Sequence, residues 1–272
     1  MNNLLKGIII GAGMILPGVS GGVLAVILGI YDKLIFSFNN LLKNKKENAM
    51  FLLPIIIGLI IGVIIFGKIL VFVFEEYKVL CSFVFIGLIL GSLPSLVKTT
   101  KKNGKIYINI LLMSFILSLL LFVLGKSNFD FNIENSTGLV FYFKMFFTGI
   151  LFISGKVIPG ISSSFLLMLI GMYDYVLNII SNPLLLFGSK ALDFIPFILG
   201  VVFGLIILIK LIHIALKKWY NITYSIIIGF VIGSLPAIYP GITFSLDGLL
   251  SIILLILGFS ASHKLSSMSN NE

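Results

Sequence analysis

The chain has 272 residues, of which 59% are hydrophobic and 11% are charged, and its net charge is +9. Soluble domains carry about 25% charged residues, so water is excluded as the main surroundings of this chain. All 19 basic residues are lysines, and most lie in short segments between apolar runs. That arrangement records orientation in a membrane and excludes nucleic acid as the partner.

Apolar runs recur along the chain and predict an all-α polytopic membrane protein. A helix that crosses the hydrocarbon core needs about 20 apolar residues. Because the runs recur over the whole length, the first of them is not a removable signal peptide. The segments predicted to cross fully are 50–74, 79–97, 106–124, 194–216, 222–239 and 249–262.

Two further apolar stretches, 7–38 and 141–180, are interrupted by Pro-Gly and by small polar residues. Each stretch is too short for two crossings and too broken for one ordinary helix. Irregular backbone survives at membrane depth only inside protein or beside a water-filled cavity. We therefore predict that each stretch is a re-entrant, broken-helix hairpin.

The chain matches itself without a gap when it is offset by 142 residues. The matched blocks consist of Pro, Gly, Lys and Tyr-Asp, which an apolar composition does not produce by chance. We predict one membrane domain, 1–272, made of repeat 1 (1–125), a linker (126–138) and repeat 2 (139–267). The clearest matched blocks are 17–20 with 159–162, 29–32 with 171–174, and 91–94 with 233–236.

A hairpin and three crossings in each copy make the number of crossings odd, so the second copy is predicted to be inverted. With both termini in the cytoplasm, eleven lysines fall inside and only three outside, as the positive-inside rule requires. A parallel repeat would place the lysines of 43–46 and 98–105 on opposite sides. The inside set is Lys6, Lys43, Lys45, Lys46, Lys98, Lys101, Lys102, Lys105, Lys217, Lys218 and Lys264, and the outside set is Lys78, Lys126 and Lys190.

The Pro-Gly breaks are the candidate binding sites. A proline suits the start of a helix, glycines let a ligand approach the main chain, and the free N–H groups of the next helix attract an anion. Two opposed breaks near the midplane would form a symmetric cradle for an oxyanion. The alternative is that they are hairpin turns with small residues for close packing. The candidate residues are Pro17, Gly18, Ser20, Gly21 and Gly22 in the first break, and Pro159, Gly160, Ser162, Ser163 and Ser164 in the second.

Ionisable residues at membrane depth are functional candidates by default. Lys156 lies three residues before the second Pro-Gly, where it either contributes to the anion site or reaches the interface. The other candidates are assigned to coupling or to hinges, with interfacial anchoring as the alternative. They are Lys68 and Lys210, which are related by the repeat, together with Tyr31, Asp32, Tyr173 and Asp174.

Residues 17–34, PGVSGGVLAVILGIYDKL, and their second copy resemble a bacterial and archaeal family once called domain of unknown function 368 and now described as polyprenyl-phosphate translocases. The resemblance covers essentially the whole chain. It implies a flippase that returns undecaprenyl phosphate from the outer to the inner leaflet for cell-wall synthesis, with the lipid and the membrane as partners. The chain departs from the family pattern at Met14, usually Asp, at Val23, usually Thr, and at Ser163, usually Gly.

Two functions other than lipid transport are alternatives for a polytopic membrane protein of this kind. A lipid phosphatase needs a nucleophile and a general acid, but the chain lacks Arg, and His213 and His263 lie outside the breaks. We therefore expect no enzyme activity. Cys81 is the single cysteine, so neither a disulfide nor a thiolate metal cluster is expected, and no cofactor is implied. A small-solute exporter or channel stays open, because inverted repeats with broken helices serve many substrates.

Overall fold

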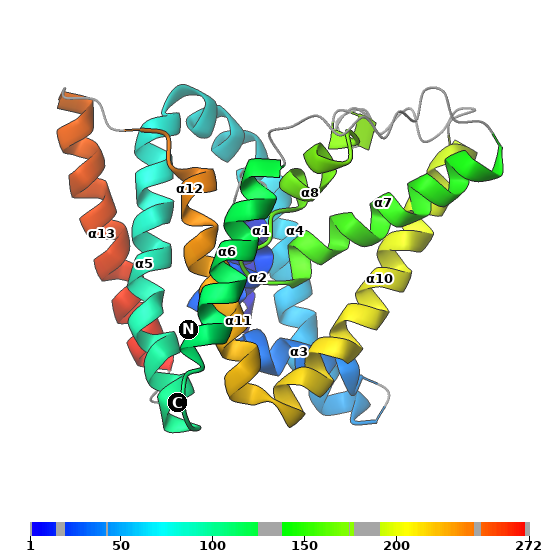
Figure 1. Ribbon diagram of the computed structural model, residues 1–272, viewed down its shortest axis with the longest axis horizontal. Helices are drawn as coiled ribbons and strands as arrows, with labels where there is room; N and C mark the ends of the chain where they lie inside the picture. The colour runs from blue at the N-terminus through cyan, green and yellow to red at the C-terminus, as the bar shows by residue number, and fades with distance from the viewer. Residues whose placement is uncertain are drawn as a thin grey trace.

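The computed structural model describes residues 2–14, 20–41, 43–124, 138–173, 175–176, 191–241 and 246–269. Every regular element in these ranges is an α-helix, as predicted (Figure 1). The elements are α1 Asn3–Gly13, α2 Gly21–Ile27, α3 Tyr31–Asn39, α4 Lys45–Glu76, α5 Lys78–Lys102, α6 Ile108–Leu124, α7 Leu139–Val157, α8 Ser163–Leu169, α10 Ala191–Lys218, α11 Tyr220–Gly233, α12 Leu235–Ile238 and α13 Leu246–Ser269.

Five helices of the described chain are long and apolar enough to cross a membrane, and the bent pair α2 and α3 is a sixth candidate if it counts as one span. The five are α4, α5, α7, α10 and the span that α11 and α12 form together. The protein is therefore a polytopic membrane protein. The described part of α6, predicted as a full crossing, has 17 residues and is about 25 Å long at the usual rise per residue.

Long helices pack in pairs that follow the repeat. Helix α1 lies against α4 and α7 against α10, and these two pairs are related by the offset of 142. Helix α13 lies against α5 and α6 against α11, so the third long helix of each copy packs on the other copy (Figure 1). The two copies are therefore interlocked. The inverted orientation of one copy relative to the other stays a prediction.

The glycines of the repeat lie where paired helices approach most closely. A Cβ atom on Gly58 would collide with the main-chain carbonyl of Leu4, and one on the equivalent Gly200 would collide with that of Phe146. Gly87 is packed in the same way against Leu255. Small residues permit such close approach of helices in a membrane, and this accounts for their recurrence at the offset of 142.

Both short helices end on a glycine that turns the chain. Gly29 has φ +66° and the equivalent Gly171 has φ +65°, which suits the residue after a helix terminus. The N–H groups of Gly29 and Ile30 donate to the carbonyls of the last turn of α2. Helix α3 begins at once and is bent by 116° from α2. The stretch 7–38 therefore contains α1, α2 and α3, and the boundary between α2 and α3 lies at Gly29 and the Tyr-Asp pair that follows it.

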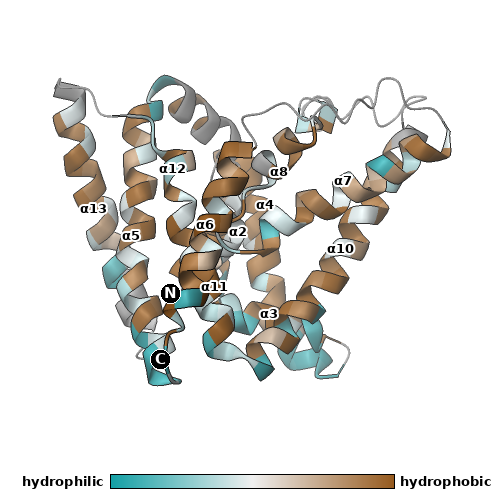
Figure 2. Ribbon diagram, in the orientation of Figure 1, coloured by the Kyte–Doolittle hydropathy of each residue, from teal (hydrophilic) through white to brown (hydrophobic). Residues whose placement is uncertain are grey.

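Polar residues gather at one edge of the molecule. The start of α4, the end of α5 and the junction of α10 with α11 lie at the lower edge in Figure 1, and this edge is hydrophilic in Figure 2. The lysines at these helix ends were predicted to share one side of the membrane. Assignment of that side to the cytoplasm stays a prediction. The lysines are Lys45, Lys46, Lys101, Lys102, Lys217 and Lys218.

Candidate functional site

The first helix break lies directly against the end of α7 and the start of the second break. The Ser20 hydroxyl donates to the carbonyls of Gly155 at 3.1 Å and Ile158 at 3.3 Å. From the other side, the Lys156 ammonium donates to the carbonyl of Met14 at 3.0 Å. Lys156 and Met14 occupy equivalent positions in the two copies, so these hydrogen bonds join the copies where their breaks meet.

An apolar groove begins at this junction. It is lined by α1, α2, α3, α4, α7 and α10, and its cavity volume is about 200 Å³. Gly21 and Gly22 form part of the wall on α2. Lys156 is the only charged side chain among the described residues that line the groove. Ile56 of α4 also lines the groove and is 38% exposed.

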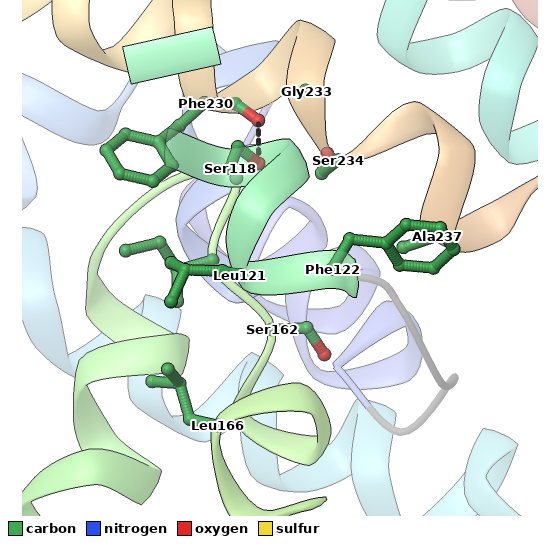
Figure 3. A pocket seen from close by; sticks show the side chains of 11 residues that line it. Ser118, Leu121, Phe122, Ser162, Leu166, Phe230, Gly233, Ser234 and Ala237 are labelled. Atoms are coloured by element: carbon green, nitrogen blue, oxygen red, sulfur yellow. Dashed lines mark hydrogen bonds between the residues drawn. The ribbon is translucent and has the colours of Figure 1, made fainter. Parts of the chain in front are cut away.

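A second, smaller cavity lies at the other break. It is lined by Gly160, Ile161 and Ser162, with Ser118 of α6 and Ser234 among the facing residues (Figure 3). Its volume is about 30 Å³, which is about the share of one water molecule in the liquid. Ser162 and Lys156 therefore line different cavities, although the sequence placed them in one cradle.

Three of the remaining break residues, Pro159, Gly160 and Ser163, are enclosed by protein. Pro159 and Gly160 are buried, and the buried Ser163 hydroxyl donates to the Phe152 carbonyl at 2.8 Å. Ser164 is half-buried on α8. Pro17 and Gly18 lie outside the described residues. The predicted contribution of these residues to an anion site stays a prediction.

Ser20 is only 3% exposed, and both of its hydrogen bonds are made to the main chain of repeat 2. In this conformation it therefore links the breaks and does not face the groove. The sequence predicted that the Ser20 hydroxyl binds the ligand. A small polar residue in a helix break does not by itself indicate which neighbour it contacts.

A third cavity, which we call the polar cavity, surrounds Asp32. The Asp32 carboxylate accepts hydrogen bonds from the hydroxyl of Tyr224 at 2.6 Å and from that of Tyr220 at 3.2 Å. Both tyrosines lie in the first turns of α11, and their ring centroids are 4.6 Å apart. Sequence reasoning missed these tyrosines. The available signal was two tyrosines four residues apart at the start of a span, which places both on one helix face.

The other predicted coupling residues lie apart from these cavities or cannot be placed fully. Lys210 is exposed on α10, and Lys68 lies on α4 with a side chain outside the described part. Tyr173 packs against the buried cluster around Met145, and Asp174 lies outside the described residues.

Broken helices within a polytopic bundle, and between them an apolar groove with one charged side chain among its described lining residues, are features of a membrane transporter. The chain belongs to the family described as "Undecaprenyl phosphate translocase-like" (VCA0040-like), whose model matches residues 10–247. It is 31% identical over 267 residues to the "Polyprenyl-phosphate transporter" of Staphylococcus aureus (strain NCTC 8325 / PS 47), covering 96% of this chain and 94% of the relative.

A second relative is the "Polyprenyl-phosphate transporter" of Vibrio cholerae serotype O1 (strain ATCC 39315 / El Tor Inaba N16961), which is 28% identical over 258 residues, 88% of this chain and 78% of the relative. No solved structure matches the chain. The family and both relatives are named for translocation or transport, so the protein is a transporter and not an enzyme.

Replacement of Ser20 by alanine is expected to lower the stability of the protein, because the Gly155 carbonyl loses its buried side-chain donor, whereas the Ile158 carbonyl keeps the Ile161 N–H. Leaving buried polar groups unpaired costs about 1–3 kcal/mol. The measurement is thermal unfolding in detergent, without substrate. Ser154→Ala is the matched control, because the Ser154 hydroxyl bonds only to the Ile150 carbonyl of its own helix at 2.7 Å. Equal losses in the two variants would contradict a linking role for Ser20.

Proposed function

We propose that the protein carries undecaprenyl phosphate, or a related polyprenyl phosphate, from the outer to the inner leaflet of the cytoplasmic membrane. The returned carrier lipid is then reused in cell-wall synthesis. Two arguments support this substrate. Both relatives are named polyprenyl-phosphate transporters, and the apolar groove has the chemistry that such a lipid requires.

The groove is the observation that carries the proposal. A polyprenyl phosphate has a long apolar tail and one anionic end, and the groove has apolar walls and a single charged side chain, Lys156, among its described lining residues. Each CH₂ group transferred from water to such a wall contributes about 0.8 kcal/mol. A small soluble anion would gain nothing from these walls, so the groove favours a lipid over a free ion.

The phosphate site in this proposal lies at the junction of the two PG(V/I)S breaks. Lys156 supplies charge, Gly21 and Gly22 allow approach to the main chain, and Ser162 completes the site when the second break opens. The cavity at Ser162 is at present too small for a phosphate, whereas the groove at Lys156 is open. Alternating access would exchange these two states around the same junction.

The decisive test uses purified protein in liposomes that contain labelled polyprenyl phosphate. We expect the headgroup to move between leaflets without release of phosphate, and Lys156→Met protein should not accelerate this movement. Release of inorganic phosphate would instead assign a phosphatase. Flux of a soluble anion without movement of the lipid would assign an exporter or channel.

The proposed orientation predicts which positions an impermeant thiol reagent can reach in intact cells. In a Cys81→Ser background, single cysteines at Lys46 and Lys218 should be protected from outside, and a cysteine at the exposed Tyr77 should be labelled. The reason is that the first two positions lie at the lysine-rich edge, which the positive-inside rule assigns to the cytoplasm. Labelling of Lys46 and Lys218 cysteines from opposite sides would refute the inverted topology.

A further inference from the structure

The polar cavity around Asp32 has no role in the lipid site described above. It is lined by the end of α2, the start of α3, α5 and the start of α11, and its volume is about 110 Å³. Around Asp32 it presents the hydroxyl groups of Ser92, Ser95, Thr99, Tyr220 and Tyr224. A cavity of this size can hold an ion and several water molecules.

The Asp32 carboxylate has no ion-pair partner within the described residues. Its contacts there are the two phenol hydroxyls, which donate to its two different oxygens. Neighbouring Lys33 is directed to the ring of Phe51, with its ammonium 4.7 Å from the ring centroid. A carboxylate at membrane depth is costly unless a cation compensates it, and the described residues supply no such cation to Asp32.

We propose that the polar cavity binds a monovalent metal cation of the Na⁺ type, with Asp32 as the charged ligand and neighbouring hydroxyl oxygens as neutral ligands. Hard cations prefer oxygen ligands of this kind. The single carboxylate balances one positive charge. A divalent ion normally has more acidic ligands, and the described residues contain no group of three or more His, Cys, Asp or Glu that could hold a metal.

The hydrogen-bond pattern favours the ionised carboxylate, which is the form that binds a metal ion. Each carboxylate oxygen already accepts from a phenol, so both donors stabilise the ionised form. A metal ion leaves both hydrogen bonds intact, because it binds the remaining lone pairs.

Tyr31 connects this cavity with the apolar groove. Its side chain lines both, and its hydroxyl donates to the carbonyl of Val157, next to Lys156, at 3.3 Å. If the proposed lipid transport holds, a cation bound at Asp32 would travel inward with the phosphate. It would offset the cost of moving an anion against an inside-negative potential.

The test measures cation binding directly, without lipid. Trp219 is the only tryptophan, is 56% exposed and directly precedes Tyr220, so its fluorescence reports on this cavity. The detergent-solubilised protein is titrated with NaCl against choline chloride at constant ionic strength and pH. We expect a saturable change in the wild type, loss of that change in Asp32→Asn, and at least tenfold weaker binding in Tyr224→Phe.

Tyr107→Phe is the control, because Tyr107 is exposed outside the cavity, and it should bind Na⁺ like the wild type. If Asp32→Asn does not fold, Tyr224→Phe still tests the cation site, since this variant removes only the hydroxyl and keeps the Asp32 carboxylate and the aromatic ring. A wild type without saturable Na⁺ dependence, or one that responds to pH alone, would overturn the proposal. Failure here leaves lipid transport untouched, because no lipid is present in this measurement.

Discussion

Lys156→Met is expected to lower the affinity for polyprenyl phosphate by at least tenfold while leaving the protein as stable as before. Lys156 is the only charged side chain among the described residues of the groove, so its loss removes the charged hydrogen bond to the headgroup. Such a bond contributes about 1.5–3 kcal/mol, and each 1.4 kcal/mol corresponds to about tenfold in affinity. The measurement is a titration of the lipid against purified protein.

Stability should not fall, because the ammonium is itself costly at membrane depth. A lysine at the centre of a spanning helix costs about 2.5–3.5 kcal/mol on insertion scales, and Lys156, in the last turn of α7, carries part of that cost. Here one hydrogen bond to the Met14 carbonyl and a distant ring, Phe152 at 5.7 Å from the ammonium, offset that cost in part. Methionine keeps the length and apolar body of the side chain, so packing against the groove is retained.

Two variants separate charge from position. Lys156→Arg keeps the charge and should keep most of the binding, although its planar group fits the groove differently. Lys144→Met removes a lysine twelve residues earlier on the same helix, outside the groove, and should bind lipid normally. Unchanged affinity in Lys156→Met, or an equal loss in Lys144→Met, would place the headgroup elsewhere.

The repeat could be predicted because its matched positions hold residues with strong effects on local backbone conformation and packing. Glycines at helix crossings and at helix ends are fixed by close backbone approach or by positive φ, so both copies retain them. Gly29 and Gly171 show this at the level of one dihedral angle. The break residues could be located for the same reason, since Pro and Gly disrupt a helix wherever they fall.

The contacts of the breaks could not be predicted, because they join residues far apart in the chain. Tyr220 and Tyr224 reach Asp32 from the other copy, and their equivalents in repeat 1 are Lys78 and Ser82. A comparison of the two repeats therefore cannot reveal the polar cavity. The hydrogen-bond partner of the Ser20 hydroxyl could not be predicted for the same reason, since only tertiary packing decides whether a hydroxyl contacts a ligand or a carbonyl.

Gly160→Ala is expected to destabilise the protein strongly and to abolish transport. Gly160 has φ +83°, and its Cβ would lie 2.5 Å from the main-chain carbon of Phe230 and 2.6 Å from the nitrogen of Val231. Backbone of α11 cannot yield as a flexible side chain does, so α8 and its serines must shift. Sequence reasoning had expected a side chain here to obstruct the ligand, but α11 is the nearer obstacle.

Gly241→Ala separates the two causes of that loss. Gly241 has φ +90° but no atom of the described residues within 4 Å of its Cβ position, so with respect to the described residues alanine there meets only the backbone strain, about 1–3 kcal/mol for a residue in such a conformation. Thermal unfolding in detergent should show a larger loss for Gly160→Ala than for Gly241→Ala, and only the second variant should still move lipid. Equal losses would mean that contact with α11 does not hold the second break in place, and that its serines are positioned by α8 alone.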